Sequence, residues 1–223
     1  MKDLTLIIPA KRESESLPFV LNELKKYNCK KLIVIPKNDN STINSIKNFK
    51  CNILKQHKDG FGSAIIEGIK KVKTKYLCIF MADGSFDPKF LKDMIFYLKK
   101  KNKDFVFNSR YEKKGGSDDD TFLTYIGNKF FTFLCNLLYN LKITDVLFTF
   151  IMGRTVLFNA IKLKETDFRL CVELPLKVKL YNFRVVNNPC YERVRLKGKK
   201  KVNEFRDGFL ILLFIIKSLF RKV

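Results

Sequence analysis

Residues Tyr76–Met81 (YLCIFM) form an unbroken apolar run, and the chain turns acidic directly after it, where Ala82–Pro88 has the sequence ADGSFDP. A short apolar run bounded by turn residues is typical of a strand that is buried on both faces. Pro88 suits the first turn of a helix, because its missing N–H would have no partner there. This stretch therefore predicts a buried strand, an acidic turn and then a helix that ends near Lys100.

The same alternation of strand and helix extends outward from this stretch. Further strands are predicted at Leu4–Pro9, Leu32–Ile35, Ile53–Lys55 and Asp104–Asn108, and further helices at Glu15–Tyr27, Thr42–Phe49 and Gly62–Val72. Strands that alternate with helices predict an α/β fold, with a mostly parallel sheet and helices on both faces. Ligands bind such sheets outside the carboxyl ends of the strands, so the residues after each strand are the candidates for a site.

The second half of the chain lacks this regular alternation. It predicts a polar loop, a long helix, a mixed segment that could contain a strand, a helix, a strand, a basic loop and a terminal helix: Lys113–Asp120, Phe122–Leu141, Thr144–Arg154, Glu173–Tyr181, Phe183–Asn187, Arg195–Lys201 and Glu204–Arg221. No repeat or linker is visible. We therefore expect one domain over residues 1–203, followed by an amphipathic helix over residues 204–223.

The composition suits one compact domain with a polyanionic partner. The chain has 223 residues, of which 46% are hydrophobic, and its formal net charge is +22. Such a surplus indicates nucleic acid, an anionic membrane or a phosphate-bearing substrate, without deciding among them. The six cysteines include no CxxC pair, which argues against a zinc cluster and favours a reduced, cytoplasmic setting.

The terminal helix is too short in apolar residues to cross a bilayer. Its apolar stretch, Phe209–Phe220 with Lys217 inside it, spans 12 residues. That is ~18 Å of helix against a hydrocarbon core of ~30 Å. With Arg221 and Lys222 beyond it, the segment could lie in the membrane interface. The alternative is that it packs on the domain or on a dimer partner.

Polar residues follow each of the five predicted strands. The sequences are PAKRE at Pro9–Glu13, NDNST at Asn38–Thr42, DGFGSA at Asp59–Ala64, MADGSFDP at Met81–Pro88 and NSRY at Asn108–Tyr111. One such segment alone would be an ordinary turn or helix cap. Five on one edge of a sheet favour a nucleotide site.

In order and spacing, these segments resemble family-2 glycosyltransferases of the GT-A fold, a Rossmann-like sheet. PAKRE, NDNST, GFGSA, MAD and NSRY are similar to the family patterns PxYNE, DDGST, GxGxA, DAD and GSRY. The closest resemblance is to the dolichol-phosphate mannosyltransferase-like, or polyprenyl-phosphate glycosyltransferase, branch. It continues through Gly127–Phe130, Thr144–Val146, Pro189–Lys201 and Phe205–Gly208, and so covers about residues 4–208.

The resemblance implies a nucleotide-sugar site. Its residues would be Pro9, Ala10, Glu13, Asp39, Gly60, Gly62 and Asp83. Glu13 matches a nucleotide-contacting Glu, and Asp39 matches an Asp that contacts the base. Each also has a simpler alternative role, Glu13 as an acid in the first turn of a helix and Asp39 as a turn residue.

The resemblance also implies a Mg²⁺ or Mn²⁺ site, and here the chain departs from the family. Asp83 matches the last Asp of DAD, but Met81 stands where the first Asp belongs. A thioether is a poor ligand for a hard cation. Ser85 falls where this branch often has a further ligand. Asp83 and Ser85 are thus the metal candidates, and three outcomes stay open: water fills the gap, metal dependence is weak, or activity is lost.

Four further residues are candidates by resemblance. Arg110 matches an Arg that approaches phosphate, and Asp145 matches a position near the acceptor. Arg195 and Lys201 match cations that approach the lipid phosphate or the donor diphosphate. The simpler alternatives are a surface ion pair for Arg110 and a capping role for Asp145. Together with Asp83, Arg110 and Asp145 form the predicted catalytic set.

The resemblance implies an inverting transfer of hexose from a GDP- or UDP-sugar to a polyprenyl or dolichyl phosphate, in cell-envelope biosynthesis. The expected location is peripheral, on the cytoplasmic face of an anionic membrane, and homo-oligomerisation is left open. One alternative is transfer to a saccharide hydroxyl in surface polysaccharide synthesis, with Asp145 as the base. A second is a basic nucleic-acid-binding protein, although the chain shows no zinc-finger, RRM or helix-turn-helix signature.

Overall fold

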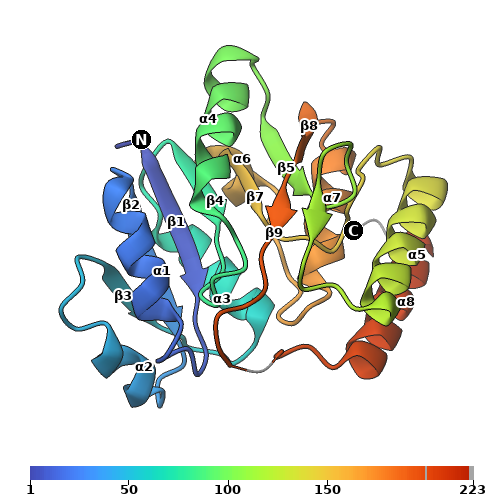
Figure 1. Cartoon of the computed structure of the whole chain (residues 1–223). Coiled ribbons are helices and arrows are strands. Elements are labelled where there is room, and N and C mark those ends of the chain that lie inside the picture. Colours follow the sequence, from blue (N-terminus) through green and yellow to red (C-terminus); the bar gives the residue numbers. More distant parts are fainter. Residues whose placement is uncertain (199, 221–223) are drawn as a thin grey trace.

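A computed structural model describes residues 1–198 and 200–220. Seven strands form one sheet in the order β3-β2-β1-β4-β7-β5-β8, with helices on both faces (Figure 1). The strands are β1 Leu4–Pro9, β2 Lys30–Ile35, β3 Asn52–Lys55, β4 Tyr76–Ile79, β5 Phe105–Ser109, β7 Ile151–Arg154 and β8 Val185–Pro189. Two short strands, β6 Gly116–Ser117 and β9 Tyr191–Glu192, pair separately. The predicted α/β sheet, mostly parallel, is confirmed.

Strand β7 is the one antiparallel member of the described sheet. It pairs with β4 on one side and with β5 on the other. The sequence predicted only a mixed segment at Thr144–Arg154, because four strand residues after a long non-repeating stretch carry little pattern. Because β7 lies between them, β5 does not pair with β4. On its other side β5 pairs in parallel with β8.

The helices differ from the sequence prediction mainly at their ends. Their bounds are α1 Leu17–Glu23, α2 Asn40–Ser45, α3 Phe61–Lys71, α4 Leu91–Lys100, α5 Phe122–Tyr139, α6 Thr155–Ala160, α7 Leu170–Leu180 and α8 Glu204–Phe220, with short 3-10 turns at Leu24–Lys26 and Pro88–Phe90. Helix α6 was not predicted, and α7 starts three residues before the predicted Glu173. The predicted end of the last helix, Arg221, lies outside the described residues.

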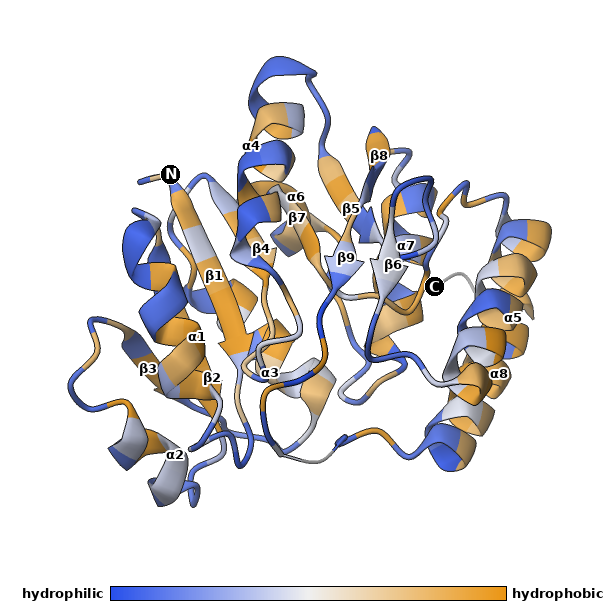
Figure 2. Cartoon of the chain, viewed as in Figure 1, coloured by the Kyte–Doolittle hydropathy of each residue, from blue (hydrophilic) through white to orange (hydrophobic). Residues whose placement is uncertain are grey.

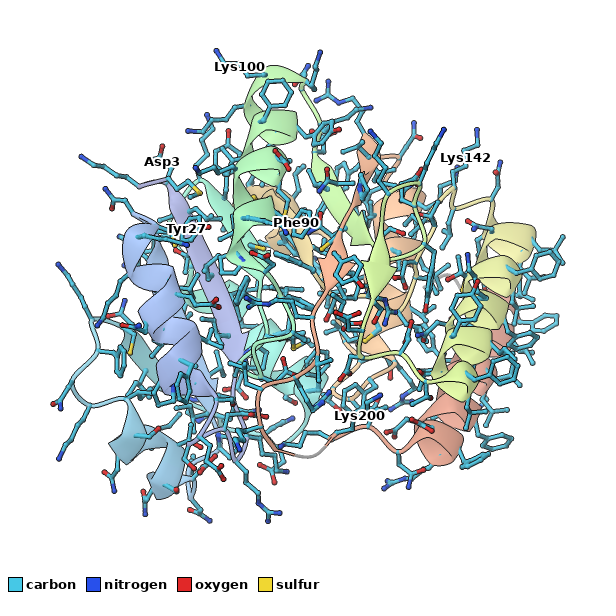
Figure 3. The ribbon with its side chains drawn as sticks, viewed as in Figure 1. Asp3, Tyr27, Phe90, Lys100, Lys142 and Lys200 are labelled. Atoms are coloured by element: carbon cyan, nitrogen blue, oxygen red, sulfur yellow. The ribbon has the colours of Figure 1, made fainter. Side chains whose placement is uncertain are left out.

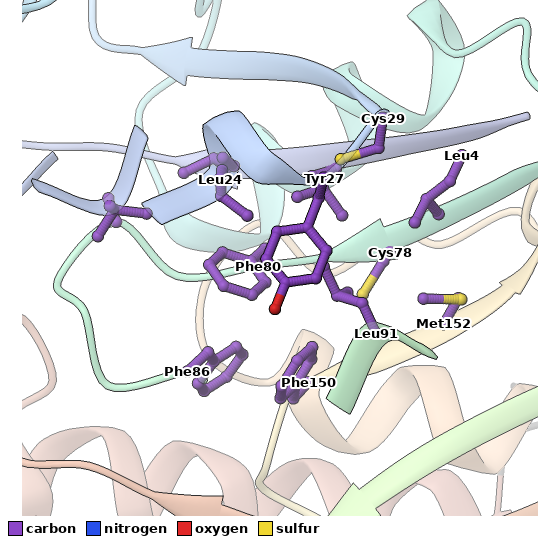
Figure 4. Close-up of a cluster of buried hydrophobic side chains, with 14 of the residues drawn as sticks. Leu4, Leu24, Tyr27, Cys29, Cys78, Phe80, Phe86, Leu91, Phe150 and Met152 are labelled. Atoms are coloured by element: carbon purple, nitrogen blue, oxygen red, sulfur yellow. The ribbon is translucent and has the colours of Figure 1, made fainter. Parts of the chain in front are cut away.

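Two apolar cores lie on the two faces of the sheet. Successive residues of β1 serve different cores: Leu6 and Ile8 pack toward α1 and α4, and Ile7 packs toward α3. This is the alternation that a strand buried on both faces requires. Figure 4 shows part of the first core, where the rings of Phe86 and Phe150 stack with centroids 4.5 Å apart.

Helices α5 and α8 lie side by side at one edge of the molecule (Figure 1). The Tyr139 hydroxyl donates a hydrogen bond to the carbonyl of Ile215, which joins the two helices near their ends. Among residues 1–198 and 200–220, no helix combines the length and the apolar character that a membrane crossing requires. All six cysteines are free thiols.

The fold brings the loops after the parallel strands to one end of the molecule. In Figure 3, Asp3 and Lys100 mark the opposite end, and Lys200 lies on the segment that leads from β9 toward α8. The predicted site residues follow strands whose carboxyl ends point the same way, so the fold gathers most of them at this end.

Candidate active site

A cleft of about 550 Å³ opens at the carboxyl edge of the sheet. Its walls come from the loops after β1, β3, β4, β5 and β9, from the segment before β7 and from the N-terminal halves of α5 and α8. Nine predicted residues line it: Pro9, Ala10, Glu13, Gly60, Asp83, Ser85, Arg110, Arg195 and Lys201. Three predicted residues do not: Asp39, Gly62 and Asp145.

Two loops, one after β4 and one after β9, lie against each other in a fixed register. The backbone N–H of Arg193 donates to the carbonyl of Ser85 at 2.9 Å, and that of Leu196 donates to the carbonyl of Asp83 at 2.8 Å. Gly84 has a φ of +86°, and a Cβ there would lie 2.5 Å from the Leu196 side chain. Only glycine combines this backbone conformation with so close an approach.

This register places the Arg195 guanidinium beside Asp83. Its Nη1 lies 3.5 Å from Asp83 Oδ2, and its Nη2 lies 3.4 Å from Asp119 Oδ2. Lys200 Nζ also lies 3.6 Å from Asp119 Oδ2. The cleft thus pairs its cations with its carboxylates.

Arg110 is surrounded by carboxylates. It donates hydrogen bonds to Asp145 from Nε at 2.7 Å and from Nη2 at 3.0 Å, and to Glu192 and Asp120 from Nη1 at 3.1 and 3.3 Å. Burial works against the charged guanidinium, but Asp145 and Glu192 raise the pKa of Arg110 well above its usual value. Burial raises the pKa of Glu192, and Arg110 opposes that shift. Arg110 therefore lines the cleft, but its guanidinium already donates hydrogen bonds to carboxylates of the protein itself.

Asp145 lies behind Arg110 and is fully buried. Both its oxygens accept from the Arg110 guanidinium, and Oδ2 also accepts from the Arg110 backbone N–H at 3.2 Å. The structure therefore places the carboxylate where it orients Arg110, outside the walls of the cleft.

Glu13 lies in the loop after β1, which forms one end of the cleft. It accepts a hydrogen bond from the Ser16 hydroxyl at 2.7 Å, and its other oxygen lies 3.2 Å from Lys201 Nζ. The Glu13 backbone N–H donates to the Thr42 hydroxyl at 3.0 Å, which ties this loop to α2.

Asp39 lies in a second hollow of about 420 Å³, which shares Lys11 and Gln56 with the main cleft. It accepts from the Arg12 backbone N–H at 2.6 Å and from the Thr42 hydroxyl at 2.8 Å. Partial burial would raise the pKa of Asp39, but these hydrogen bonds lower it below its usual value. The carboxylate caps α2 and stays charged at the edge of the hollow.

The two glycines before and within α3 face the protein's own backbone. A Cβ on Gly60 would lie 2.2 Å from the carbonyl oxygen of Thr166, and one on Gly62 would lie 2.2 Å from that of Glu165. Gly60 also has a φ of +125°. These contacts explain the glycines without a phosphate.

The side chains at Asp83 do not fit a divalent ion held by the protein. Asp83 Oδ1 already accepts from the Ser85 backbone N–H at 3.1 Å and from its hydroxyl at 2.8 Å. Met81 offers a thioether at the other candidate position. Among residues 1–198 and 200–220 there is no group of three or more His, Cys, Asp or Glu that could hold a metal.

Several residues of the cleft were missed by sequence reasoning. Asp119, Asp120, Glu192 and Lys200 line it. The run Asp118–Asp120 could have indicated the first two, but its loop was predicted only to be polar. Glu192 belongs to the segment that resembles the family, but its contact with Arg110 spans 82 residues of sequence.

Comparison with known proteins identifies related sequences and structures. The family model described as Glycosyl transferase family 2 matches residues 5–162. Glucosyl-3-phosphoglycerate synthase from Mycobacterium tuberculosis, solved with Mn²⁺, UDP and phosphoglyceric acid, has a TM-score of 0.76 at 11% identity, covering 97% of this chain and 78% of that one. Mannosyl-3-phosphoglycerate synthase from Rubrobacter xylanophilus has a TM-score of 0.72 at 13% identity, covering 98% and 74%.

Proposed function

The chain belongs to glycosyl transferase family 2, and we propose that it moves a hexose from a nucleoside diphosphate sugar to a polyprenyl phosphate at a membrane surface. The family and the GT-A fold make it a glycosyltransferase. The dolichol-phosphate mannosyltransferase-like branch, the inversion of the anomeric carbon and a peripheral position on the cytoplasmic face are parts of this proposal. It rests on how the cleft meets the helix pair α5 and α8.

The outer wall of the cleft belongs to the same two helices that expose apolar side chains. Thr124 and Asn128 of α5 and Leu210 and Ile211 of α8 line the cleft. On other faces, the pair exposes Phe122, Leu123, Tyr125, Ile126, Phe130, Phe133, Leu137 and Leu138 from α5, and Phe205, Phe209, Ile216, Leu219 and Phe220 from α8. This juxtaposition is the observation that carries the proposal.

An apolar surface of this kind suits a lipid interface. Figure 2 shows both helices strongly hydrophobic along much of their length, at one edge of the molecule. Lys129 lies on α5, Lys217 lies on α8, and Lys142 comes just after α5. Each Lys or Arg near an anionic membrane contributes about 1 kcal/mol to membrane binding. An acceptor whose chain stays in the membrane would then present its phosphate at the cleft.

The chemistry asked of the cleft is charge handling and alignment. An acceptor phosphate oxygen attacks the anomeric carbon, the bond to the donor's β-phosphate breaks, and a nucleoside diphosphate leaves. A phosphate is already anionic near neutral pH, so it needs no strong base. Arg195, Lys200 and Lys201 are among the cations that line the cleft, and we assign them to the phosphates.

Asp39 and Glu13 suit the nucleoside end of the donor. The two hollows meet at Lys11 and Gln56, and the carboxylates of Asp39 and Glu13 lie in neighbouring parts of this region. Carboxylates accept hydrogen bonds from ribose hydroxyls and ring N–H groups. The donor set at Asp83 and Ser85 does not fit the Mg²⁺ or Mn²⁺ ion that the resemblance implies, so no step is assigned to an ion.

Vesicle flotation tests the membrane surface with a matched pair of variants. Phe209 on α8 and Phe19 on α1 are 61% and 62% exposed, so a charge at either position costs the fold similarly little. Phe209→Glu should weaken flotation with anionic vesicles about tenfold, whereas Phe19→Glu should leave it unchanged. Equal flotation of all three proteins would contradict the proposed surface.

A second candidate, transfer to a hydroxyl acceptor, is favoured by one observation. Glu192 and Asp120 line the cleft, and burial raises the pKa of Glu192, which suits a general base. The structural neighbours named above are phosphoglycerate glycosyltransferases, so a phosphorylated hydroxy acid is one acceptor to include. Asp145, the base expected from the sequence, is fully buried and does not line the cleft.

A further inference from the structure

Asp83 is the position at which the cleft departs most clearly from a metal site, because its neighbour is a cation and not a further metal ligand. Met81 precedes Asp83 by two residues, and Ser85 follows it by two. The thioether is a poor ligand for a hard cation, and the Ser85 hydroxyl is committed to Asp83. Residues 81–85 therefore bring a single carboxylate to this point, and the carboxylate of Asp119 lies on the other side of the Arg195 guanidinium.

Arg195 is fixed beside that carboxylate by the main chain. The hydrogen bonds from Arg193 to Ser85 and from Leu196 to Asp83 bracket it on both sides. The Arg193 guanidinium further donates to the carbonyls of Gly84 and Phe86 at 3.1 Å each. These main-chain hydrogen bonds thus hold a positive charge beside Asp83.

Arg195 also keeps unused capacity to bind an anion. Its contacts with Asp83 and Asp119, at 3.5 and 3.4 Å, are longer than a good charged hydrogen bond of about 2.7–2.9 Å. Its Nε is buried and has no hydrogen-bond partner among the described residues. Arg110 contrasts with it, because its guanidinium donates four hydrogen bonds of 2.7 to 3.3 Å.

Lys200 brings a second cation to the same place. Its ammonium lies 3.6 Å from Asp119 Oδ2 and donates to the Asp119 carbonyl at 3.2 Å. Arg195 and Lys200 therefore share one carboxylate, and together they carry the two positive charges that a divalent ion would bring. Phosphate oxygens form strong, bidentate hydrogen bonds with a guanidinium. They should therefore bind it more strongly than one shared carboxylate at 3.4 Å does.

We propose that Arg195 and Lys200 hold the donor's diphosphate in place of a metal ion, so that nucleoside diphosphate binds this chain without a divalent cation. The inference rests on the proposed function in requiring a nucleoside diphosphate donor. The phosphate oxygens take over Arg195 Nη2 and the Lys200 ammonium from Asp119, while Asp83 keeps its two hydrogen bonds from Ser85.

Calorimetric titration of the full chain with UDP and with GDP, in EDTA and in Mn²⁺, tests the proposal without any variant. We expect one nucleotide to bind in EDTA with a Kd less than about fivefold weaker than in Mn²⁺. Electron paramagnetic resonance of Mn²⁺ with the protein alone should show only the free ion. Binding that weakens about fivefold or more in EDTA would overturn the proposal.

Variants of the loop after β9 assign the effect to its residues. Arg195→Met and Lys200→Met should each weaken nucleotide binding at least tenfold, in EDTA and in Mn²⁺ alike, because each loses a charged contact with phosphate. Lys197→Met removes a charge from an exposed position of the same loop and should bind as the wild type does. Losses at Arg195 and Lys200 no larger than that of Lys197→Met would overturn their role.

The titration also separates this inference from the proposed function. Mn²⁺-dependent binding of UDP or GDP would refute the cation substitution and leave a nucleotide-sugar enzyme standing. If neither nucleotide binds in either buffer while the protein remains folded by circular dichroism, the donor class itself is wrong.

Discussion

Arg110 Nε lies 2.7 Å from Asp145 Oδ2, and this contact is one of several that make Arg110 a connector within the protein. The same guanidinium reaches Glu192 on β9 and Asp120 in the loop before α5. Three segments far apart in sequence thus meet on one buried cation. Its loss would leave three carboxylates facing each other with little solvent.

Arg110→Met should lower the free energy of unfolding by about 3–5 kcal/mol near neutral pH, because it leaves buried charges without a partner. The deficit should shrink as pH falls, because burial raises the pKa of Glu192 and the variant lacks the Arg110 charge that opposes this shift, so protonation of Glu192 removes one uncompensated charge. Urea unfolding at several pH values measures both effects.

Arg184→Met is the matched control for that substitution. Arg184 pairs with Asp104 through Nε at 2.9 Å, but its side chain is 52% exposed. Water replaces much of what this ion pair provides, so the loss should be clearly smaller than for Arg110. Equal losses in the two variants would show that Arg110 has no special structural role.

The sequence predicted the position of the cleft because that position follows from topology. Parallel strands place their carboxyl ends at one edge, so the loops after Pro9, Ile79 and Ser109 had to converge. The buried strand at Tyr76 and the acidic turn after it lie as predicted. Nine predicted site residues therefore line the cleft.

The sequence could not predict which charges pair with each other. Arg110 was expected to approach phosphate, but it meets Asp145 and Glu192 at sequence separations of 35 and 82 residues. Such contacts depend on the pairing of β5 with β7 on one side and with β8 on the other, which short-range patterns do not encode. Gly60 and Gly62 likewise owe their place to a backbone segment near Thr166, about a hundred residues away.

Gly62→Ala should destabilise the fold by about 1–3 kcal/mol, because its Cβ would collide with the Glu165 carbonyl. Gly127→Ala supplies the contrast: it lies inside α5, and a Cβ there has no atom within 4 Å. That variant should instead gain about 0.5–1 kcal/mol from helix propensity. Thermal melting of both variants checks the pair, and a stable Gly62→Ala protein would contradict the close packing.

Glu192→Gln separates the two acceptor classes. With a phosphate acceptor no strong base is needed, so the rate should fall less than about tenfold. With a hydroxyl acceptor and Glu192 as base, the rate should fall about 10²–10⁴-fold, and the wild-type rate should rise with pH through the raised pKa of Glu192. Rates measured across pH for both proteins decide between them, and a flat profile with a small loss supports the phosphate acceptor.

Asp104 should contribute to acid sensitivity away from the cleft. The hydrogen bond from Arg184 lowers the pKa of Asp104 below its usual 3.8, with burial opposing. A carboxyl with a lowered folded pKa stabilises the protein above its unfolded pKa, and this contribution is lost as pH falls through the folded value. Asp104→Asn should therefore lose less stability than the wild type on acidification below about pH 4. Parallel urea curves that fall by the same amount in both proteins would refute this.

The most direct test of the proposed function is the fate of the hexose. The full chain would be incubated with labelled UDP- and GDP-hexoses and vesicles that contain polyprenyl phosphate, with saccharide and 3-phosphoglycerate acceptors in parallel. We predict that label from one donor enters the lipid fraction in step with nucleoside diphosphate release. Label that enters only a saccharide or 3-phosphoglycerate, with none in the lipid, would contradict it.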